Sequence, residues 1–476
     1  MISGVVTENA TAFPAQNLMM SYFDLIGSSA TEKNLALLEE GIVNHYLKNG
    51  YFSPQVFVES HPQFDNIFSV KISEPILLSF RVNGGRSDTR TKANSYLNTL
   101  IGSNLVSSSA INYLVSSLEN RLGVGVELSY TELTQPARGF DIAVQLTGDI
   151  SSSLTLSNSG NNSLGRETVF AEIQFVEQLP GFNSIYLNTF DSLDGNGYRS
   201  LGAGFNYELN SNNEVNLNTN KSRVRYKYDS GIKDTIYDQT FISLKWQVNV
   251  AEAANTAKYF YANYINQQLE RRNTTTDLEE TLNIVELAYW QQNLSNKSSN
   301  YWKLGFGKGL DSMGSELVGV VANPDIELDF SRYTMEFIYN LDITENTSLT
   351  IDFSAQYSND YLPYSQRFVV ANNSVAPAYE FGEWSGDSGA GSKVELARGV
   401  NLSLLSSRWV PYLYYGAGKV RDNYRKESTS VGSIGLGARW FNKKMSFYFE
   451  LGKPLTEDSV YRGSHARVDT GLTLWF

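Results

Sequence analysis

Arg467-Val-Asp-Thr-Gly-Leu-Thr-Leu-Trp-Phe476 is the stretch of sequence that decides the fold. One set of alternate residues is Val468, Thr470, Leu472, Leu474 and Phe476, and the intervening set is Asp469, Gly471, Thr473 and Trp475. Because strand side chains point to opposite faces with period two, one face of this strand is mainly apolar and the other is small or polar. Such a strand suits a wall between lipid and water. We interpret Leu472, Leu474 and the terminal Phe476 as the signal that closes a transmembrane barrel.

Two preceding segments repeat this alternation. Met445, Phe447, Phe449 and Leu451 oppose Ser446, Tyr448, Glu450 and Gly452, and Ile434, Leu436, Ala438 and Trp440 oppose Ser433, Gly435, Gly437 and Arg439. A single alternating segment is more often a half-buried strand of a soluble sandwich. Three in succession favour a barrel.

The composition is compatible with a barrel in a membrane. The chain has 7 Trp, 29 Tyr and 25 Phe, enough to supply aromatic girdles at both membrane interfaces. It has no apolar run long enough for a membrane helix, and its mean hydropathy is −0.29. The absence of cysteine excludes disulfides and thiolate metal sites, and the net charge of −12 argues against nucleic acid as a partner.

The patterns divide the chain into four parts. We expect residues 1–16 to be a flexible lead, because they are polar and contain glycine, asparagine and proline. Residues 17–75 and 76–149 predict two small α+β units with the order βααββ. Residues 150–476 lose the helical spacing and predict an antiparallel barrel of about 16 strands.

Two βααββ units ahead of such a barrel resemble the outer-membrane transporter of two-partner secretion, the haemolysin-activator and filamentous-haemagglutinin-transporter family. The small units would then be POTRA domains. Three stretches carry the resemblance: Tyr46-Leu-Lys-Asn-Gly-Tyr51, Leu156-Ser-Asn-Ser-Gly-Asn-Asn-Ser-Leu-Gly-Arg166, and the ordered series Gln356–Leu362, Ser365–Phe368, Ser385–Gly389 and Glu395-Leu396.

The resemblance implies a loop at about 371–391 that folds into the barrel lumen. In the family this loop carries an Arg that pairs with an Asp on a following strand, but the matching positions here are Pro377 and Gly416. Losing both partners is physically coherent, because an unpaired buried charge costs about 3–5 kcal/mol whereas removing both can be nearly neutral. We expect the loop to plug the lumen through its own packing residues, which are Pro377, Tyr379, Phe381, Trp384 and Asp387.

The resemblance also implies the function and location. It predicts a bacterial outer-membrane transporter, with POTRA domains in the periplasm, that captures an unfolded exoprotein carrying an N-terminal secretion domain and passes it through the lumen. The predicted edge strands that bind this substrate contain Val124, Val126, Leu128, Tyr130, Phe140, Ile142 and Val144. Further partners would be the lipid bilayer and the barrel-assembly machinery during biogenesis. Because residues 1–6 lack signal-peptide features, we expect a mature or trimmed form.

Three alternatives have to be weighed. A barrel-assembly factor of the same superfamily would share POTRA units, and a gated porin would pass small solutes. Gly386-Asp-Ser-Gly389 copies the nucleophile signature of a serine protease, but His45, His61 and His465 are scattered and none lies in a conventional motif. We therefore predict that the chain is not an enzyme and holds no metal or cofactor.

Overall fold

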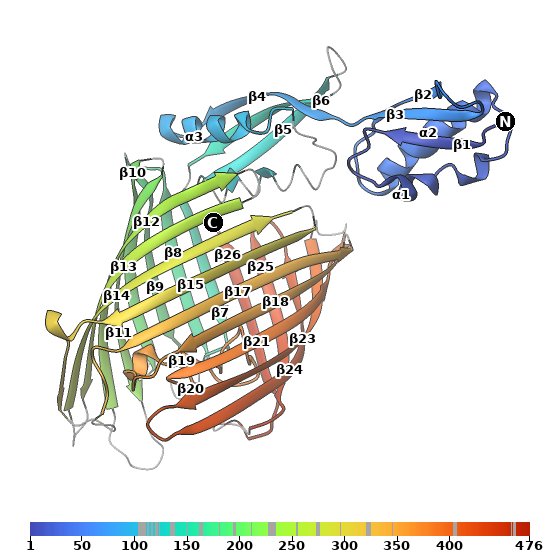
Figure 1. Cartoon of the computed structure of the whole chain (residues 1–476). Helices are drawn as coiled ribbons and strands as arrows, with labels where there is room; N and C mark the ends of the chain where they lie inside the picture. Colours follow the sequence, from blue (N-terminus) through green and yellow to red (C-terminus); the bar gives the residue numbers. More distant parts are fainter. Residues whose placement is uncertain are drawn as a thin grey trace. The chain divides into compact units, whose positions relative to one another are not determined.

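The structure is a computed structural model that divides into two compact units, Met1–Asp149 and Ile150–Phe476 (Figure 1). It describes residues 1–102, 111, 114, 115, 118, 119, 122, 124–133, 139–148, 150–160, 165–179, 181–193, 197–210, 212–226, 235–253, 256–272, 277–295, 297–319, 325–344, 346–402, 407–457, 459 and 463–476. Among these residues, no helix has the length and apolar character needed to cross a membrane.

The first half of the N-terminal unit is a three-stranded sheet with two helices. Its elements are β1 (Gly4–Glu8), α1 (Ala15–Met19), the short η1 (Phe23–Leu25), α2 (Glu32–Lys48), β2 (Gln55–Ser60) and β3 (Ile67–Ser73). The sheet order is β1-β3-β2, and β1 runs parallel to β3. The prediction that residues 1–16 are a flexible lead is therefore wrong. Backbone pairing with β3 and the fully buried side chain of Ile2 hold this polar stretch in place.

Tyr46 and Tyr51 fix the segment that follows β1. The Phe13 ring lies 4.9 Å from the Tyr46 ring and 4.7 Å from the Tyr51 ring. The Tyr46 hydroxyl donates to the buried Glu74 carboxylate at 2.7 Å, and the same carboxylate accepts the backbone N–H of Ala12 at 2.8 Å. Burial and this carboxylate both raise the pKa of Tyr46. The motif at the end of α2 is thus part of the core.

The second half of the unit repeats the sheet order. It contains β4 (Ile76–Gly84), α3 (Ser87–Asn98), β5 (Gly125–Leu133) and β6 (Gly139–Thr147), arranged as β4-β6-β5. Ile111, Leu114, Leu118 and Leu122 are helical and buried. β5 is an edge strand, but β6 pairs on both sides, so the prediction that Phe140, Ile142 and Val144 form an edge is wrong. Their buried side chains alternate because they form the core.

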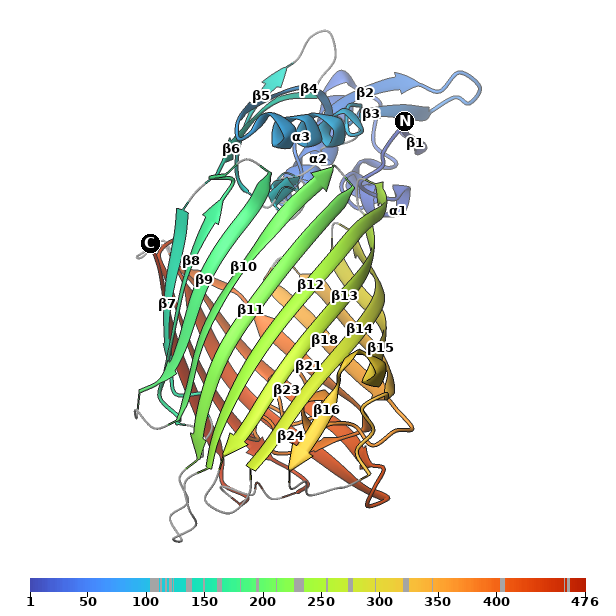
Figure 2. The ribbon, with the colours of Figure 1, turned by 90° about the vertical axis from the view of Figure 1, so that its left-hand side faces the viewer.

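The second unit is a closed antiparallel barrel, as predicted (Figure 2). Its segments are β7 (Ile150–Ser157), β8 (Thr168–Val176), β9 (Phe182–Ser192), β10 (Tyr198–Asn210), β11 (Asn213–Tyr226), β12 (Thr235–Ala253), β13 (Thr256–Arg272), β14 (Asp277–Leu294), β15 (Ser298–Gly309), β16 (Glu316–Gly319), β17 (Ser331–Thr344), β18 (Thr347–Tyr357), β21 (Ser388–Arg398), β22 (Val400–Leu402), β23 (Ser407–Asp422), β24 (Glu427–Phe441), β25 (Met445–Pro454) and β26 (Arg467–Trp475). The short η2 (Asp311–Met313) separates β15 from β16. Because β15 with β16 and β21 with β22 are each one interrupted strand, the wall has sixteen strands.

The two faces of the wall follow the alternation of the sequence. On β24 Leu436 is 56% exposed, whereas Ser433 on the opposite face is fully buried. Leu413 on β23 is likewise exposed, and Tyr414 is buried. Exposed apolar side chains on one face and buried polar or small ones on the other are the arrangement that a lipid-embedded barrel requires. The last strand pairs with the first, from Gly471 opposite Ser157 to Trp475 opposite Ser153, and this closes the barrel.

The segment between β18 and β21, residues 358–387, contacts the inner face of the wall, and we call it the lumen loop. It contains η3 (Tyr364–Gln366), β19 (Phe368–Val369) and β20 (Ser385–Gly386). The predicted bounds of 371–391 are shifted. Residues 388–391 belong to β21 in the wall, and the loop begins directly after Tyr357.

Candidate functional site: the lumen loop and its anchors

A buried carboxylate fixes the two ends of the lumen loop to each other. Asp387 is fully buried and accepts the backbone N–H of Leu362 at 2.9 Å and that of Asn423 at 2.7 Å. The Arg367 guanidinium lies 3.5 Å from the same carboxylate. Asp387 was predicted to belong to the plug, and the structure places it at the root of the loop. There it joins the start of the loop, at Leu362, to the residue that follows β23, Asn423.

Ser388 has a structural partner in the backbone. Its hydroxyl donates to the Ser358 carbonyl at 2.9 Å and accepts the Ser358 N–H at 3.0 Å. His45 lies on α2 and His61 follows β2, in the other unit, while His465 precedes β26. Within the described ranges, no three His, Asp or Glu side chains gather as metal ligands. The Gly-Asp-Ser-Gly sequence therefore has a full explanation as the closure of the loop.

The first arm of the loop contacts β13 and β14. Leu362 packs into an apolar cluster that contains Leu282 and Ile284 of β14. The Gln366 side chain donates to the Gln267 side chain of β13 at 3.4 Å, and its carbonyl accepts from Gln356 at 2.9 Å. These contacts attach residues 362–366 to one side of the wall.

The second arm places Val375 in a notch formed by three glycines of β21 and β23. A Cβ atom on Gly416 would lie 1.9 Å from the Val375 carbonyl oxygen. A Cβ on Gly391 would lie 2.3 Å, and one on Gly418 2.8 Å, from a Val375 methyl group. No side chain fits at these positions while the loop is docked. This explains why Gly416 stands where the family places an Asp: close backbone packing replaces the ion pair.

The residues after Val375 continue along the inner wall. Tyr379 is 1% exposed, and its hydroxyl donates to the Glu457 carbonyl at 2.8 Å. Pro377 is buried as well, and Trp384 is half-buried beside the cluster of Val370 and Val375. Phe381 is 68% exposed, so the structure does not place most of its side chain against the wall, as the prediction required. It precedes Gly382, which has a positive φ and donates its backbone N–H to the Ala371 carbonyl at 3.1 Å.

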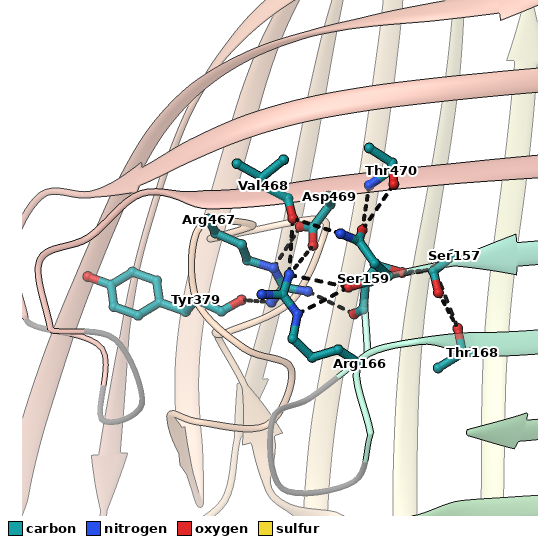
Figure 3. Close-up of polar contacts among 10 residues, drawn as sticks. Ser157, Ser159, Arg166, Thr168, Tyr379, Arg467, Val468, Asp469 and Thr470 are labelled. Carbon is teal, nitrogen blue, oxygen red and sulfur yellow. Dashed lines mark hydrogen bonds and ion pairs between the residues drawn. The ribbon is translucent and has the colours of Figure 1, made fainter. Parts of the chain in front are cut away.

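Arg467 of β26 holds the loop by its backbone (Figure 3). Its guanidinium donates to the Tyr379 carbonyl at 2.5 Å and to the Ser159 carbonyl at 2.8 Å. The Asp469 carboxylate, two residues along the strand, accepts from the Arg467 Nε at 2.6 Å. The Arg467 side chain is 4% exposed. The resemblance implies a lock whose cation lies on the loop, whereas Arg467 lies on the wall and extends to the loop. The loop has its own cation near its root, since Arg367 lies 3.0 Å from Asp422 of β23.

The same cluster joins the first and last strands. Arg166 donates to the Val468 carbonyl at 3.0 Å, and the Asn158 side chain accepts the backbone N–H of Thr470 at 2.6 Å. These contacts extend the β26–β7 pairing beyond its last paired residues, Gly471 and Ser157. Arg467 therefore links the position of the loop to the closure of the barrel.

The two arms reach opposite sides of the wall. Around the sixteen strands, β14 and β26 are eight positions apart in either direction. The loop thus crosses the bore. A cavity of about 240 Å³ remains beside it, lined by Phe368 of the loop and by wall residues that include the paired Lys303 and Glu336, 2.9 Å apart.

The sequence predicted a loop in the lumen but did not predict the contacts that fix this loop to the wall. Val375 and Arg467 carry the decisive contacts, and neither belongs to a recognisable motif. Arg467 begins the final alternating strand, so its parity with Asp469 and Gly471 could have placed it on the inner face. Its partner, a backbone carbonyl 88 residues earlier, leaves no mark in the sequence.

Comparisons with known proteins agree with this architecture. Residues 141–440 match the family model described as haemolysin secretion/activation protein ShlB/FhaC/HecB. The fold is similar to that of CdiB from Escherichia coli, with 14% identity, a TM-score of 0.67 and coverage of 100% of this chain and 90% of that one. CdiB from Acinetobacter baumannii gives 13% identity, a TM-score of 0.59 and coverage of 100% and 90%.

A third solved structure has the same fold, and sequence comparison gives no curated counterpart. BamA from Haemophilus ducreyi lacking POTRA domains 1–3 gives 12% identity, a TM-score of 0.50 and coverage of 99% of both chains. No curated protein matches the chain in sequence. With its family match spanning more than half of its length and its sixteen-stranded barrel, this chain belongs to the ShlB/FhaC/HecB family, the outer-membrane transporters that translocate exoproteins in two-partner secretion.

Proposed function

We propose that the lumen loop is a removable plug and that the exoprotein crosses the outer membrane through the bore that it vacates. The observation that carries this proposal is the path of the loop, which runs from Leu362 on one side of the wall to Tyr379 on the other. An extended polypeptide needs a continuous bore. The docked loop crosses that bore, so transport requires it to move.

The chemistry of the Arg467 contact suits release. The guanidinium holds a neutral backbone carbonyl, and its charge partner Asp469 lies on the same strand. When the loop leaves Arg467, the Arg467–Asp469 pair stays intact, so neither of these two buried charges is left unpaired. An exoprotein passing in extended form brings its own backbone carbonyls, which can accept from Arg467 in turn. Because Arg467 can replace the Tyr379 carbonyl by a carbonyl of the exoprotein, the lost hydrogen bond is regained and the barrier to opening is lower.

The two halves of the N-terminal unit act in this proposal as periplasmic POTRA domains that capture the exoprotein. No strand in the described part of the chain pairs with the outer edge of β5, and this supports the role, because an extended segment can add there as a further strand. The Val126 N–H points away from β6, since it donates to the Glu119 side chain at 3.3 Å. By alternation, the N–H groups of Leu128 and Tyr130 point the same way. These two residues are the proposed capture sites.

A disulfide between the loop and the wall tests the plug. Because the chain has no cysteine, a double variant Val375→Cys/Gly391→Cys carries the only thiols. The cysteine at position 375 replaces the two valine methyl groups that exclude a side chain at position 391 by a single Sγ atom. A Cβ built on Gly391 lies 3.2 Å from the residue 375 Cβ, slightly below the range of about 3.5–4.5 Å that disulfides adopt, so a small backbone shift lets the bond form. Under oxidising conditions we expect secretion of the exoprotein to stop, and reductant to restore it.

The two single variants are the controls, since they change the same packing but cannot form the bond. If the oxidised double variant secreted as well as either single variant, the loop would not need to move. A barrel-assembly factor would instead show reduced insertion of other barrels after the same tether. A porin would lose only its conductance to small solutes.

A further inference from the structure

The inner face of the wall is apolar beneath the second arm of the lumen loop. Val420 of β23 and Val431 of β24 point into the bore and are only 3% and 2% exposed. Val370 and Val375 of the loop cover them. The strands β21, β23 and β24 are neighbours in the wall (Figure 1), and they form what we call the valine pocket, which consists of Gly391, Gly416, Gly418, Val420 and Val431. The inside of a water-filled barrel is ordinarily polar, so this apolar pocket needs a cover, which the docked loop supplies.

Lys393 of β21 holds the loop beside this pocket. Its Nζ donates to the Asn373 carbonyl at 2.9 Å, two residues before the valine that fills the pocket. The Lys393 side chain is 14% exposed and has two acidic neighbours on the wall, Asp352 at 3.6 Å and Glu395 at 3.9 Å. These acids stay beside Lys393 when the loop leaves. Like Arg467, Lys393 is therefore a wall cation that can exchange one backbone carbonyl for another.

Ser433 of β24 lies at the pocket with an unused hydroxyl. It stands opposite Gly416 in the register of the two strands, and a Cβ on Gly416 would lie 3.5 Å from its Oγ. Ser433 is fully buried, and its hydroxyl has no hydrogen-bond partner among the residues that the structure describes. A buried polar group without a partner costs free energy. The wall thus offers a donor that the docked loop does not use.

We propose that the valine pocket, with Lys393 and Ser433, binds the exoprotein during its passage, and that the lumen loop fills the same site as a substitute ligand while transport is idle. The proposal rests on the proposed function, in which the loop leaves the bore. The matching ligand is an unfolded segment with a branched aliphatic side chain, valine or isoleucine, that enters the pocket. Its backbone carbonyls accept from the Lys393 ammonium and the Ser433 hydroxyl.

Such a site links opening of the bore to the sequence of the passing chain. When Val375 leaves, the pocket is exposed to water unless another apolar side chain enters it. An entering valine restores the lost burial, whereas a polar side chain of the same shape brings a polar group into the pocket. The difference corresponds to about a tenfold change in occupancy. Segments with aliphatic residues should therefore be held at this wall, and polar segments should not.

Disulfide trapping of a halted exoprotein tests the proposal. A folded domain fused to the exoprotein halts it in the bore, and Ser433→Cys places the only thiol of this chain at the pocket. The probes are two versions of the exoprotein, with Gly-Ser-Val-Cys-Ser-Gly or Gly-Ser-Thr-Cys-Ser-Gly inserted in the halted segment. Threonine has the shape of valine, with a hydroxyl in place of one methyl group. We expect the valine segment to form the disulfide about tenfold faster.

Ser243→Cys is the matched control, because Ser243 is a buried serine on the inner face of β12, eight strands away around the wall. There the two segments should react at equal rates. Gly418→Ala would place a methyl group 2.8 Å from the Val375 side chain, so it fills the pocket and should remove the preference for valine at Ser433→Cys. Folding of each variant is checked by heat-dependent gel mobility, and Gly391→Ala replaces Gly418→Ala if that variant fails to fold.

The outcomes separate this proposal from the proposed function. Equal rates for the two segments at Ser433→Cys, or the same preference for valine at Ser243→Cys, would overturn the binding site. Disulfides at Ser243→Cys without any at Ser433→Cys would also overturn it, but would leave passage through the bore intact. A halted exoprotein that reaches neither thiol would contradict the bore as the path itself.

Discussion

Gly416→Ala places one methyl group where the docked loop leaves no room. The new Cβ would lie 1.9 Å from the Val375 carbonyl oxygen, and real Cβ atoms keep at least 3.0 Å, so the backbone must withdraw by about 1.1 Å. That movement takes Val375 out of the notch it shares with Gly391 and Gly418. Overpacking of this kind costs typically about 1–3 kcal/mol. A middle value of about 2 kcal/mol raises the ratio of undocked to docked loop about thirtyfold.

Thiol labelling measures this ratio directly. Val375→Cys introduces the only thiol of the chain and leaves in place the carbonyl that clashes with residue 416. When docking is fast, the rate of modification by a bulky maleimide follows the fraction of loops that have left the wall. We expect Gly416→Ala to raise this rate about thirtyfold, in line with the population shift.

Gly432→Ala is the control for this experiment. It adds the same methyl group to the neighbouring strand β24, where the nearest atom would be a flexible Thr456 methyl group at 3.4 Å. Its labelling rate should stay within about twofold of the parent, since a contact at that distance is tolerated. Equal rates for the two alanine variants would refute the claim that the glycine notch holds the loop.

Three further predictions address the other anchors. Arg467→Met leaves the buried Asp469 with Arg166, 3.7 Å away, as its remaining cation, so the cost should lie at or below the lower end of the range of about 3–5 kcal/mol for a broken buried pair and should lower the temperature of the gel-mobility shift. Arg467→Met/Asp469→Asn should restore most of this loss, and an equal loss in both variants would argue against the buried pair. Tyr46→Phe should destabilise the first half of the N-terminal unit by about 1–3 kcal/mol, because Glu74 loses a hydrogen-bond donor at 2.7 Å. This should be measured as faster amide hydrogen exchange in α2, and unchanged exchange would contradict the prediction. Leu128→Pro removes an edge N–H and should reduce secretion with the barrel still in the membrane, whereas unaltered secretion would count against capture at β5.

The barrel could be predicted from the sequence because its determinant is local. In each wall strand the alternation of residue types indicates which face is apolar, as Leu472 and Leu474 alternate with Gly471 and Thr473. Many such strands in succession predict a closed barrel. The strand β1 escaped prediction because its stability comes from pairing with β3, more than fifty residues later. The central place of β6 escaped for the same reason, since strand order in a sheet depends on partners and not on pattern.

The anchors of the lumen loop show where such local reasoning ends. Val375 and Gly416 matter only together, because one supplies a backbone oxygen and the other the space for it. Valine and glycine are not residue types that indicate a functional role, and a motif search looks for an arginine and an aspartate where this chain has Pro377 and Gly416. The replacement has a physical advantage. If an ion pair joined the loop to the wall at this point, opening would separate the two charges and leave each one buried without a partner, which is energetically costly. At this anchor the charged pair, Arg467 and Asp469, stays together on β26, and release of the Tyr379 carbonyl exchanges only hydrogen bonds and packing. The one loop-to-wall ion pair among the described anchors is Arg367 with Asp422 of β23, 3.0 Å apart, near the root of the loop.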